Sequence, residues 1–160
     1  MGSRGQDYEK NVAALDAETA KVASRLLSDF KSTSTFRVVE RGKNLNGMKL
    51  LGLIDPAGTE KDVSKSYWKL KPFLEQVTDS DLLDGESMQG QYQNVRKIAF
   101  EHEFPVETNG RVEMVDFYIK AYYDPKMGKT MVDSIHPKQM GSRTGHRWDE
   151  HTNRLWRPNR

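Results

Sequence analysis

The sequence predicts an α+β fold in which two helices pack against a curved, mainly antiparallel sheet. Two segments, 7–30 and 59–77, carry apolar residues at every third or fourth position, which is typical of helices with one buried side. Within 96–124, two β-type runs flank Asn109-Gly110, which is the sequence of a tight hairpin turn. The expected order is therefore helix, two short strands, helix and three long strands, followed by an irregular basic tail.

The first helix is expected over residues 7–30, where one apolar stripe is formed by Val12, Leu15, Thr19, Val22, Leu26 and Phe30. Two β-type runs follow, TFRVVE at 35–40 and MKLLGLI at 48–54, with turn-forming residues between them. The second run is apolar almost throughout, as expected of a strand that is covered on both faces. Both runs are therefore predicted to be strands.

The second helix is expected to begin near Thr59, because Thr59 and Asp62 have the spacing of a helix-capping box. Its apolar stripe consists of Val63, Tyr67, Leu70, Leu74 and Val77. Pro72 interrupts this stripe and should kink or restart the helix, because proline has no N–H to donate to the preceding turn. Residues 79–90 are interpreted as a polar connector with one short helical turn.

The long strands are predicted on either side of Asn109 and Gly110. With these two residues as the turn, four pairs share one face: Phe104 with Val115, His102 with Phe117, Phe100 with Ile119, and Ile98 with Ala121. Seven of the eight are apolar, and a register shift of one residue would move the whole set to the opposite face. The run TMVDSIHP at 130–137 should return as the third long strand and end at Pro137.

This order of elements, over residues 7–136, resembles the cone-shaped fold of the nuclear transport factor 2-like superfamily. That superfamily includes ketosteroid-isomerase-like enzymes and many non-catalytic interaction domains. The resemblance is carried by the order of elements and by no motif. It therefore implies a shape with a pocket, and no functional residue is transferred with it.

Length and composition limit the classes of protein. A chain of 160 residues suits one domain, at 1–137, with a tail at 138–160. The absence of cysteine excludes disulfides, thiol nucleophiles and cysteine zinc sites, and it fits a reducing compartment. No apolar run reaches transmembrane length, and the first residues do not form a secretory signal. We therefore expect a soluble, intracellular protein of the cytoplasm or an organelle matrix, without membrane insertion.

The tail differs from the rest of the chain in charge. Six Lys or Arg and two acidic residues give it +4, which leaves −2 for residues 1–137 out of a total of +2. Tryptophan and arginine bury large areas at protein interfaces, so we expect a protein partner to contact Arg147, Trp148, Arg154, Leu155, Trp156 and Arg157. One alternative is single-stranded RNA, with phosphates bound by the arginines of the tail and bases stacked on its two tryptophans: Arg143, Arg147, Arg154, Arg157 and Arg160 with Trp148 and Trp156. The other is a tail that folds back over its own domain.

The histidines of the tail do not have the spacing of metal ligands. His146 and His151 are five residues apart, whereas two ligands on one helical face need a spacing of three or four. The sequence also contains no hydrolase elbow and no phosphate-binding loop. We therefore expect no metal site and no cofactor.

His102 is the candidate catalytic residue, because it lies in the middle of the predicted apolar stripe. If the third strand places Met131 and Ile135 on that face, Asp133 joins His102 there. A buried imidazole with a carboxylate partner can act as a general base in an isomerase or dehydratase of small molecules. The alternative, which we favour, is a core histidine with a structural hydrogen bond.

The sequence as a whole favours a non-enzymatic domain that binds other protein subunits and belongs to a larger assembly. A small-molecule enzyme or ligand-binding cone that uses His102 and Asp133 is the first alternative. RNA binding through the tail is the second.

Overall fold

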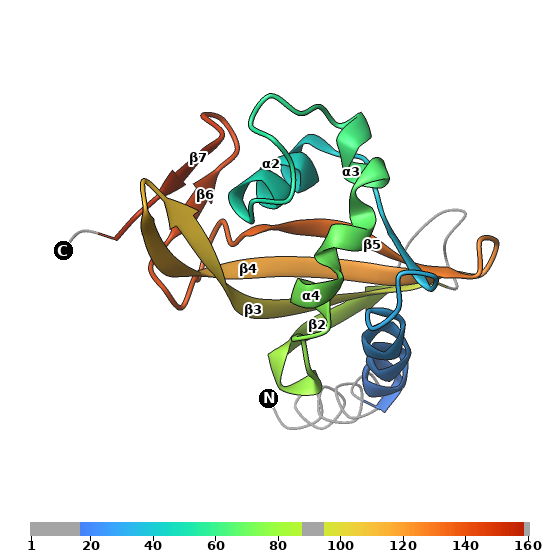
Figure 1. Ribbon diagram of the computed structural model, residues 1–160. Coiled ribbons are helices and arrows are strands. Elements are labelled where there is room, and N and C mark those ends of the chain that lie inside the picture. Colours follow the sequence, from blue (N-terminus) through green and yellow to red (C-terminus); the bar gives the residue numbers. More distant parts are fainter. Residues whose placement is uncertain (1–16, 88–94, 159–160) are drawn as a thin grey trace, which may run out of the picture.

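The computed structural model describes residues 17–87 and 95–158, and it confirms the α+β class (Figure 1). Five strands form one sheet in the order β1-β5-β4-β3-β2. Neighbouring strands are antiparallel except β1 and β5, which are parallel. The strands are β1 (Phe36–Val38), β2 (Leu82–Ser87), β3 (Arg96–Thr108), β4 (Arg111–Asp124) and β5 (Lys129–Pro137).

Helical segments cover one face of this sheet, and α2 (Gly42–Leu50) lies against the edge of β5 beyond the end of β1. The covering segments are the N-terminal helix, described over 17–29, then α3 (Lys61–Lys65), the 3-10 turn η1 (Tyr67–Leu70), α4 (Lys71–Leu74) and the 3-10 turn η2 (Asp79–Asp81). The first part of the predicted N-terminal helix, residues 7–16, lies outside the described residues.

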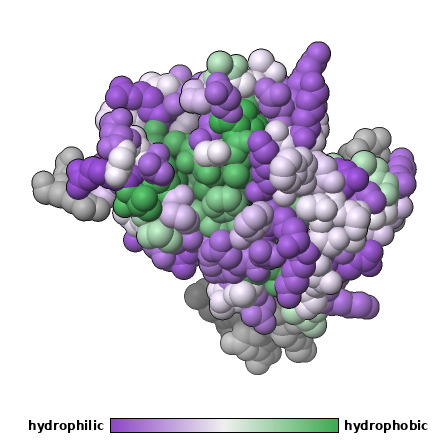
Figure 2. Space-filling model, in the orientation of Figure 1, coloured by the Kyte–Doolittle hydropathy of each residue, from purple (hydrophilic) through white to green (hydrophobic). Residues whose placement is uncertain are grey.

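The apolar core fills the space between this face and the helices. Phe30, directly after the N-terminal helix, meets Phe100 edge to face, with ring centroids 6.1 Å apart, and Phe73 meets Phe104 in the same way at 5.4 Å. Phe100 and Phe104 are both fully buried in β3. Figure 2 shows apolar side chains around α2 and between α2 and α4, with polar residues surrounding them.

The predicted second helix is divided into α3, η1 and α4. Pro72 stands in the first turn of α4, where a missing N–H is tolerated because that donor has no partner within the helix. The predicted restart at Pro72 is therefore confirmed. The connector after it is only partly as predicted, because the expected helical turn is η2 but residues 82–87 form the strand β2.

The β3–β4 hairpin has the predicted register at all four pairs, from Phe104 with Val115 to Ile98 with Ala121. Asn109 and Gly110 have φ values of 53° and 78°, and two consecutive positive values are what a hairpin turn of the primed type requires. The turn sequence and the apolar alternation agree with each other, so one register satisfies both.

The predicted strand at 48–54 is wrong, because this run contains the end of α2 and the turn after it. Met48, Leu51 and Ile54 are buried, so the run is apolar as expected but its spacing is that of a helix and turn. A short apolar run does not by itself distinguish the two structures.

The predicted irregular tail is also wrong. Its residues form a two-stranded sheet of β6 (Arg147–Asp149) and β7 (Arg154–Trp156), which lies beside α2 (Figure 1). The N–H of Trp148 donates to the carbonyl of Lys138 at 3.0 Å, and the amides of Asn46 and Asn153 meet at 3.4 Å. The tail therefore folds back onto the domain, as one of the alternatives predicted.

Candidate functional site

The predicted pair of His102 and Asp133 does not form. Nδ1 of His102 lies 2.9 Å from Oδ2 of Asp81, and its ring packs against Phe104 with centroids 5.0 Å apart. Asp133 instead makes ion pairs with Arg41 at 2.9 Å and with Lys97 at 3.1 Å. His102 thus contacts one carboxylate, that of Asp81, whereas Asp133 contacts two cations, so the predicted base and its predicted partner do not meet.

A β-bulge explains why Asp133 is not on the face of the sheet that carries His102. Lys120 pairs with Ser134 and Ala121 pairs with Val132, so Asp133 is an extra residue between two pairs of the ladder. The bulge turns the Asp133 carboxylate toward Lys97, which alternates with the buried Ile98 along β3. Asp133 therefore lies on the face of the sheet that α3 and α4 do not cover.

The residues predicted to bind a partner divide between the two sides of the β6–β7 ribbon. Trp148 pairs with Leu155 on the inner side, and Trp148 is only 5% exposed. On the outer side Trp156 is 44% exposed and has the guanidinium carbons of Arg147 and Arg154 within 5.9 Å and 5.6 Å of its ring centroid. The indole N–H donates to Asp149 at 3.3 Å, which fixes the ring on this outer side.

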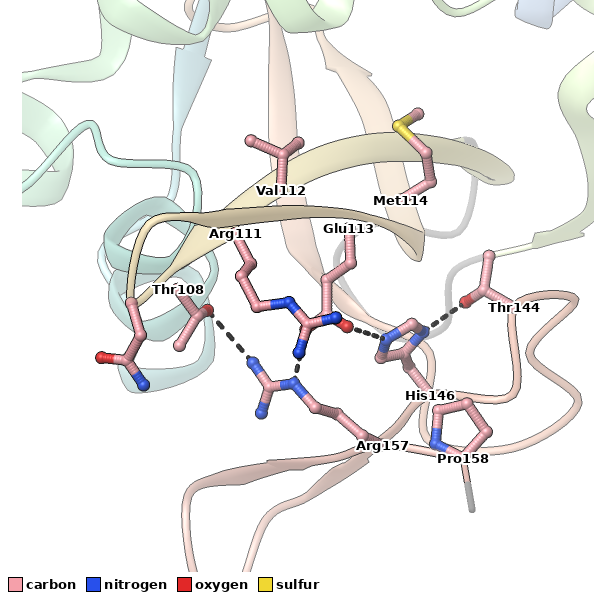
Figure 3. Close-up of a pocket in the computed structure, with 10 residues that line it drawn as sticks. Thr108, Arg111, Val112, Glu113, Met114, Thr144, His146, Arg157 and Pro158 are labelled. Atoms are coloured by element: carbon pink, nitrogen blue, oxygen red, sulfur yellow. Dashed lines mark hydrogen bonds and ion pairs between the residues drawn. The ribbon is translucent and has the colours of Figure 1, made fainter. Parts of the chain in front are cut away.

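A hollow of about 840 Å³ separates the tip of the β3–β4 hairpin from the tail. Figure 3 shows Arg111 and Glu113 projecting from β4 toward His146 and Arg157. Glu113 accepts hydrogen bonds from both, and Arg157 also donates to Thr108 at 3.1 Å. Burial disfavours the Glu113 carboxylate, but hydrogen bonds from His146 and Arg157 and the charge of Arg157 outweigh it and lower the pKa of Glu113. Arg157, predicted to bind a partner, is thus engaged within the chain.

Thr144, His146 and Glu113 lie in a row that resembles a hydroxyl–imidazole–carboxylate relay (Figure 3). The Thr144 hydroxyl oxygen has three neighbours: Nδ1 of His146 at 2.8 Å, the N–H of Asp116 at 3.1 Å and the Ser142 hydroxyl at 3.1 Å. One donor and two acceptor positions are all that a hydroxyl offers. No lone pair remains for attack on a substrate, so this row fastens the tail to β4.

A network of ion pairs fastens the tail at a second place. The fully buried carboxylate of Asp116 accepts the backbone N–H of Arg143 at 2.9 Å and its guanidinium at 3.2 Å. Glu101 pairs with Lys138 and, at 3.3 Å, with Arg143. The hydrogen bond to Asp116 raises the pKa of Arg143 above its already high value. These contacts between distant segments have no signal in the sequence.

The two histidines of the tail, His146 and His151, do not lie together as metal ligands would. Within 17–87 and 95–158, no three His, Asp or Glu side chains are placed to hold a metal ion. His151 is exposed, whereas His146 is buried beside Glu113.

No helix in the described part of the chain is long and apolar enough to cross a membrane.

His136 should make the stability of the protein depend on pH. It is buried in β5, and this burial lowers its pKa, with a further contribution from the charge of Lys43. The unfolded chain therefore binds a proton near pH 6.5 that the folded protein does not bind, so the free energy of unfolding should fall as the pH falls below about 6.5. We expect His136→Gln to destabilise at about pH 7.5 by about 1 kcal/mol and to show a smaller difference from the parent at about pH 5. Urea unfolding at both pH values measures this, and an unchanged difference would contradict it.

Comparisons with protein-family models, with curated proteins and with solved structures found no match to this chain. The relation to the nuclear transport factor 2-like superfamily therefore stays a prediction from the order of elements.

Proposed function

We propose that this chain is a non-enzymatic interaction domain that docks onto another protein through the outer side of the β6–β7 ribbon. The observation that carries the proposal is Trp156, a large aromatic side chain that is 44% exposed although the domain buries its neighbours Trp148 and, in part, Leu155. The docking face consists of Arg147, Arg154 and Trp156.

The chemistry of this face suits a protein interface. Tryptophan and arginine are the residues that most often dominate binding energy, because each buries a large area. Trp156 is already oriented by Asp149 and by two guanidinium groups, so little side-chain entropy is lost when a partner covers it. The inner residues Trp148 and Leu155 support this arrangement, although the sequence predicted that they contact the partner directly.

RNA is less well suited to the same face. Arg147 and Arg154 already lie near the ring of Trp156, so a base would have to displace a guanidinium to stack there. Asp149 places negative charge beside the ring, where a phosphate backbone would be repelled. An apolar protein segment carries no charge for Asp149 to repel, and it can pack on the exposed part of the ring beside the two guanidinium groups without displacing them.

Trp156→Ser should weaken association with the partner at least about tenfold while the domain stays folded, because the side chain is outside the core. The matched control is Trp68→Ser, since Trp68 is 52% exposed and lies in η1, away from the tail. Affinity purification of parent and variants from the cells that make the protein, with quantitative mass spectrometry, measures the loss. Equal recovery of partners with Trp156→Ser would refute the proposal, and an equal loss with Trp68→Ser would place the docking face elsewhere.

A further inference from the structure

A second hollow, of about 500 Å³, lies on the face of the sheet that α3 and α4 leave uncovered. Its floor consists of Lys97, Tyr118, Lys120, Ser134 and His136, from three neighbouring strands. The N-terminal turn of α2 and tail residues 138–140 form its walls. The folded-back tail therefore completes this hollow, which the strands alone would leave as an open surface.

Positive charge dominates the lining of the hollow, which contains five cationic side chains and two carboxylates: Arg41, Lys43, Lys97, Lys120 and Lys138 against Asp133 and Glu150. Both Asp133 oxygens are occupied, one by Arg41 at 2.9 Å and the other by Lys97 at 3.1 Å. The side chain of Asp133 is only 5% exposed, so it organises these cations and is shielded from a ligand in the hollow. Lys138 is paired with Glu101. The lining as a whole attracts anions.

Lys43 is the cation best placed to meet a ligand. Among the residues that the structure describes, no carboxylate lies within ion-pair distance of Lys43, although the side chain is partly buried. Burial first, and then the charge of Arg41, lower the pKa of Lys43. A bound anion would compensate for both the lost hydration and this repulsion. The positive N-terminal end of the nine-residue helix α2 adds to the same field.

One part of the floor, with the rim beside it, suits a flat or apolar group. The rings of Tyr118 and His136 lie against each other with centroids 5.7 Å apart and an angle of 38°. Nδ1 of His136 donates to the carbonyl of Pro137 at 2.8 Å. Its Nε2 has no hydrogen-bond partner in the described part of the chain. Met140 is 83% exposed at the rim. An apolar group placed here would cover exposed apolar surface.

We infer that this hollow binds a small organic phosphate, with its phosphate group against Lys43 and Arg41 and its flat or apolar part against Tyr118 and Met140. A phosphate dianion meets several cations at once and suits the end of a helix better than a single carboxylate does. The volume is within the range of small-ligand sites. The site is separate from the docking face around Trp156 and does not depend on the proposed function.

Calorimetric titration of the full chain with phenyl phosphate, inorganic phosphate and phenol tests this inference. We expect phenyl phosphate to bind several-fold more tightly than inorganic phosphate, and phenol not to bind.

Lys43→Met should weaken phenyl phosphate binding at least about tenfold, the effect of losing one charge-assisted contact. The matched control is Lys49→Met, in the last turn of α2 and outside the hollow, which should change affinity less than about twofold. Glu150→Gln should strengthen binding about threefold, because it removes the one carboxylate not held by two cations.

Each outcome decides part of the inference. Equal affinity in the parent and Lys43→Met, or an equal loss with Lys49→Met, would overturn the assignment of the phosphate to this hollow. Phenol binding as tightly as phenyl phosphate would show that charge is not recognised. Equal affinities for phenyl phosphate and inorganic phosphate would show that Tyr118 and Met140 do not bind the apolar part of the ligand. Absence of binding by both phosphate probes would overturn the site as a whole.

Discussion

Replacing Asn44 with leucine is expected to lower the free energy of unfolding by at least about 3 kcal/mol. The Asn44 side chain is fully buried and takes the place of a neighbouring strand along the free edge of β5. Its Nδ2 donates to the carbonyls of Val39 at 2.8 Å and Asp133 at 3.1 Å, and its Oδ1 accepts the N–H of Ile135 at 2.8 Å. Leucine has similar volume but no polar atom, so three backbone groups would lose their partners, and the two buried ones, the carbonyl of Asp133 and the N–H of Ile135, would each cost about 1–3 kcal/mol.

The matched control for Asn44→Leu is the same substitution at Asn46, two residues later in α2. The amide of Asn46 makes one long contact, 3.4 Å from Asn153, so Asn46→Leu should change stability by less than about 0.5 kcal/mol. Urea unfolding followed by circular dichroism measures both variants. Equal stabilities of the two leucine variants would contradict the role given to Asn44.

The hairpin could be predicted from sequence because two independent signals coincide. Asn109-Gly110 specifies a turn with positive φ, and the apolar residues on both sides specify one register. The run at 48–54 had only one signal, its apolar character, which a helix end and a strand share. What decides between them is the contact of α2 with β5, which joins residues about 90 positions apart.

The tail and the bulge show which site features the sequence does not reveal. The ribbon depends on Trp148 and Leu155 alternating with outward residues, but strands of three residues are too short for that alternation to be distinguished from irregular chain. One extra residue at Asp133 places its carboxylate on the opposite face of the sheet from His102. The cationic hollow combines three strands, α2 and the tail, so it has no local pattern to read.

The packing of α2 against β5 also makes Gly47 a position where two physical effects have opposite signs. Helix propensity alone predicts that Gly47→Ala stabilises the protein by about 1 kcal/mol. A Cβ at this position, however, would lie 2.0 Å from the backbone carbonyl oxygen of Ile135 and 3.2 Å from the Cα of His136. Backbone atoms of a paired strand cannot move aside as a flexible side chain can, so α2 would have to withdraw from the sheet edge. We expect Gly47→Ala to destabilise the protein by at least about 3 kcal/mol.

Gly42→Ala is the control for this prediction, because it lies in the first turn of the same helix and its added Cβ would meet only the side-chain tip of Glu60, at 3.2 Å. It should leave the stability within about 1 kcal/mol of the parent. Thermal and urea unfolding measure both variants, and titration of Gly47→Ala with phenyl phosphate should show weaker binding, since Lys43 moves with α2. If Gly47→Ala unfolds at the parental midpoint, α2 does not approach β5 this closely. In that case the strand-like role of Asn44 and the position of Lys43 in the hollow would both be wrong.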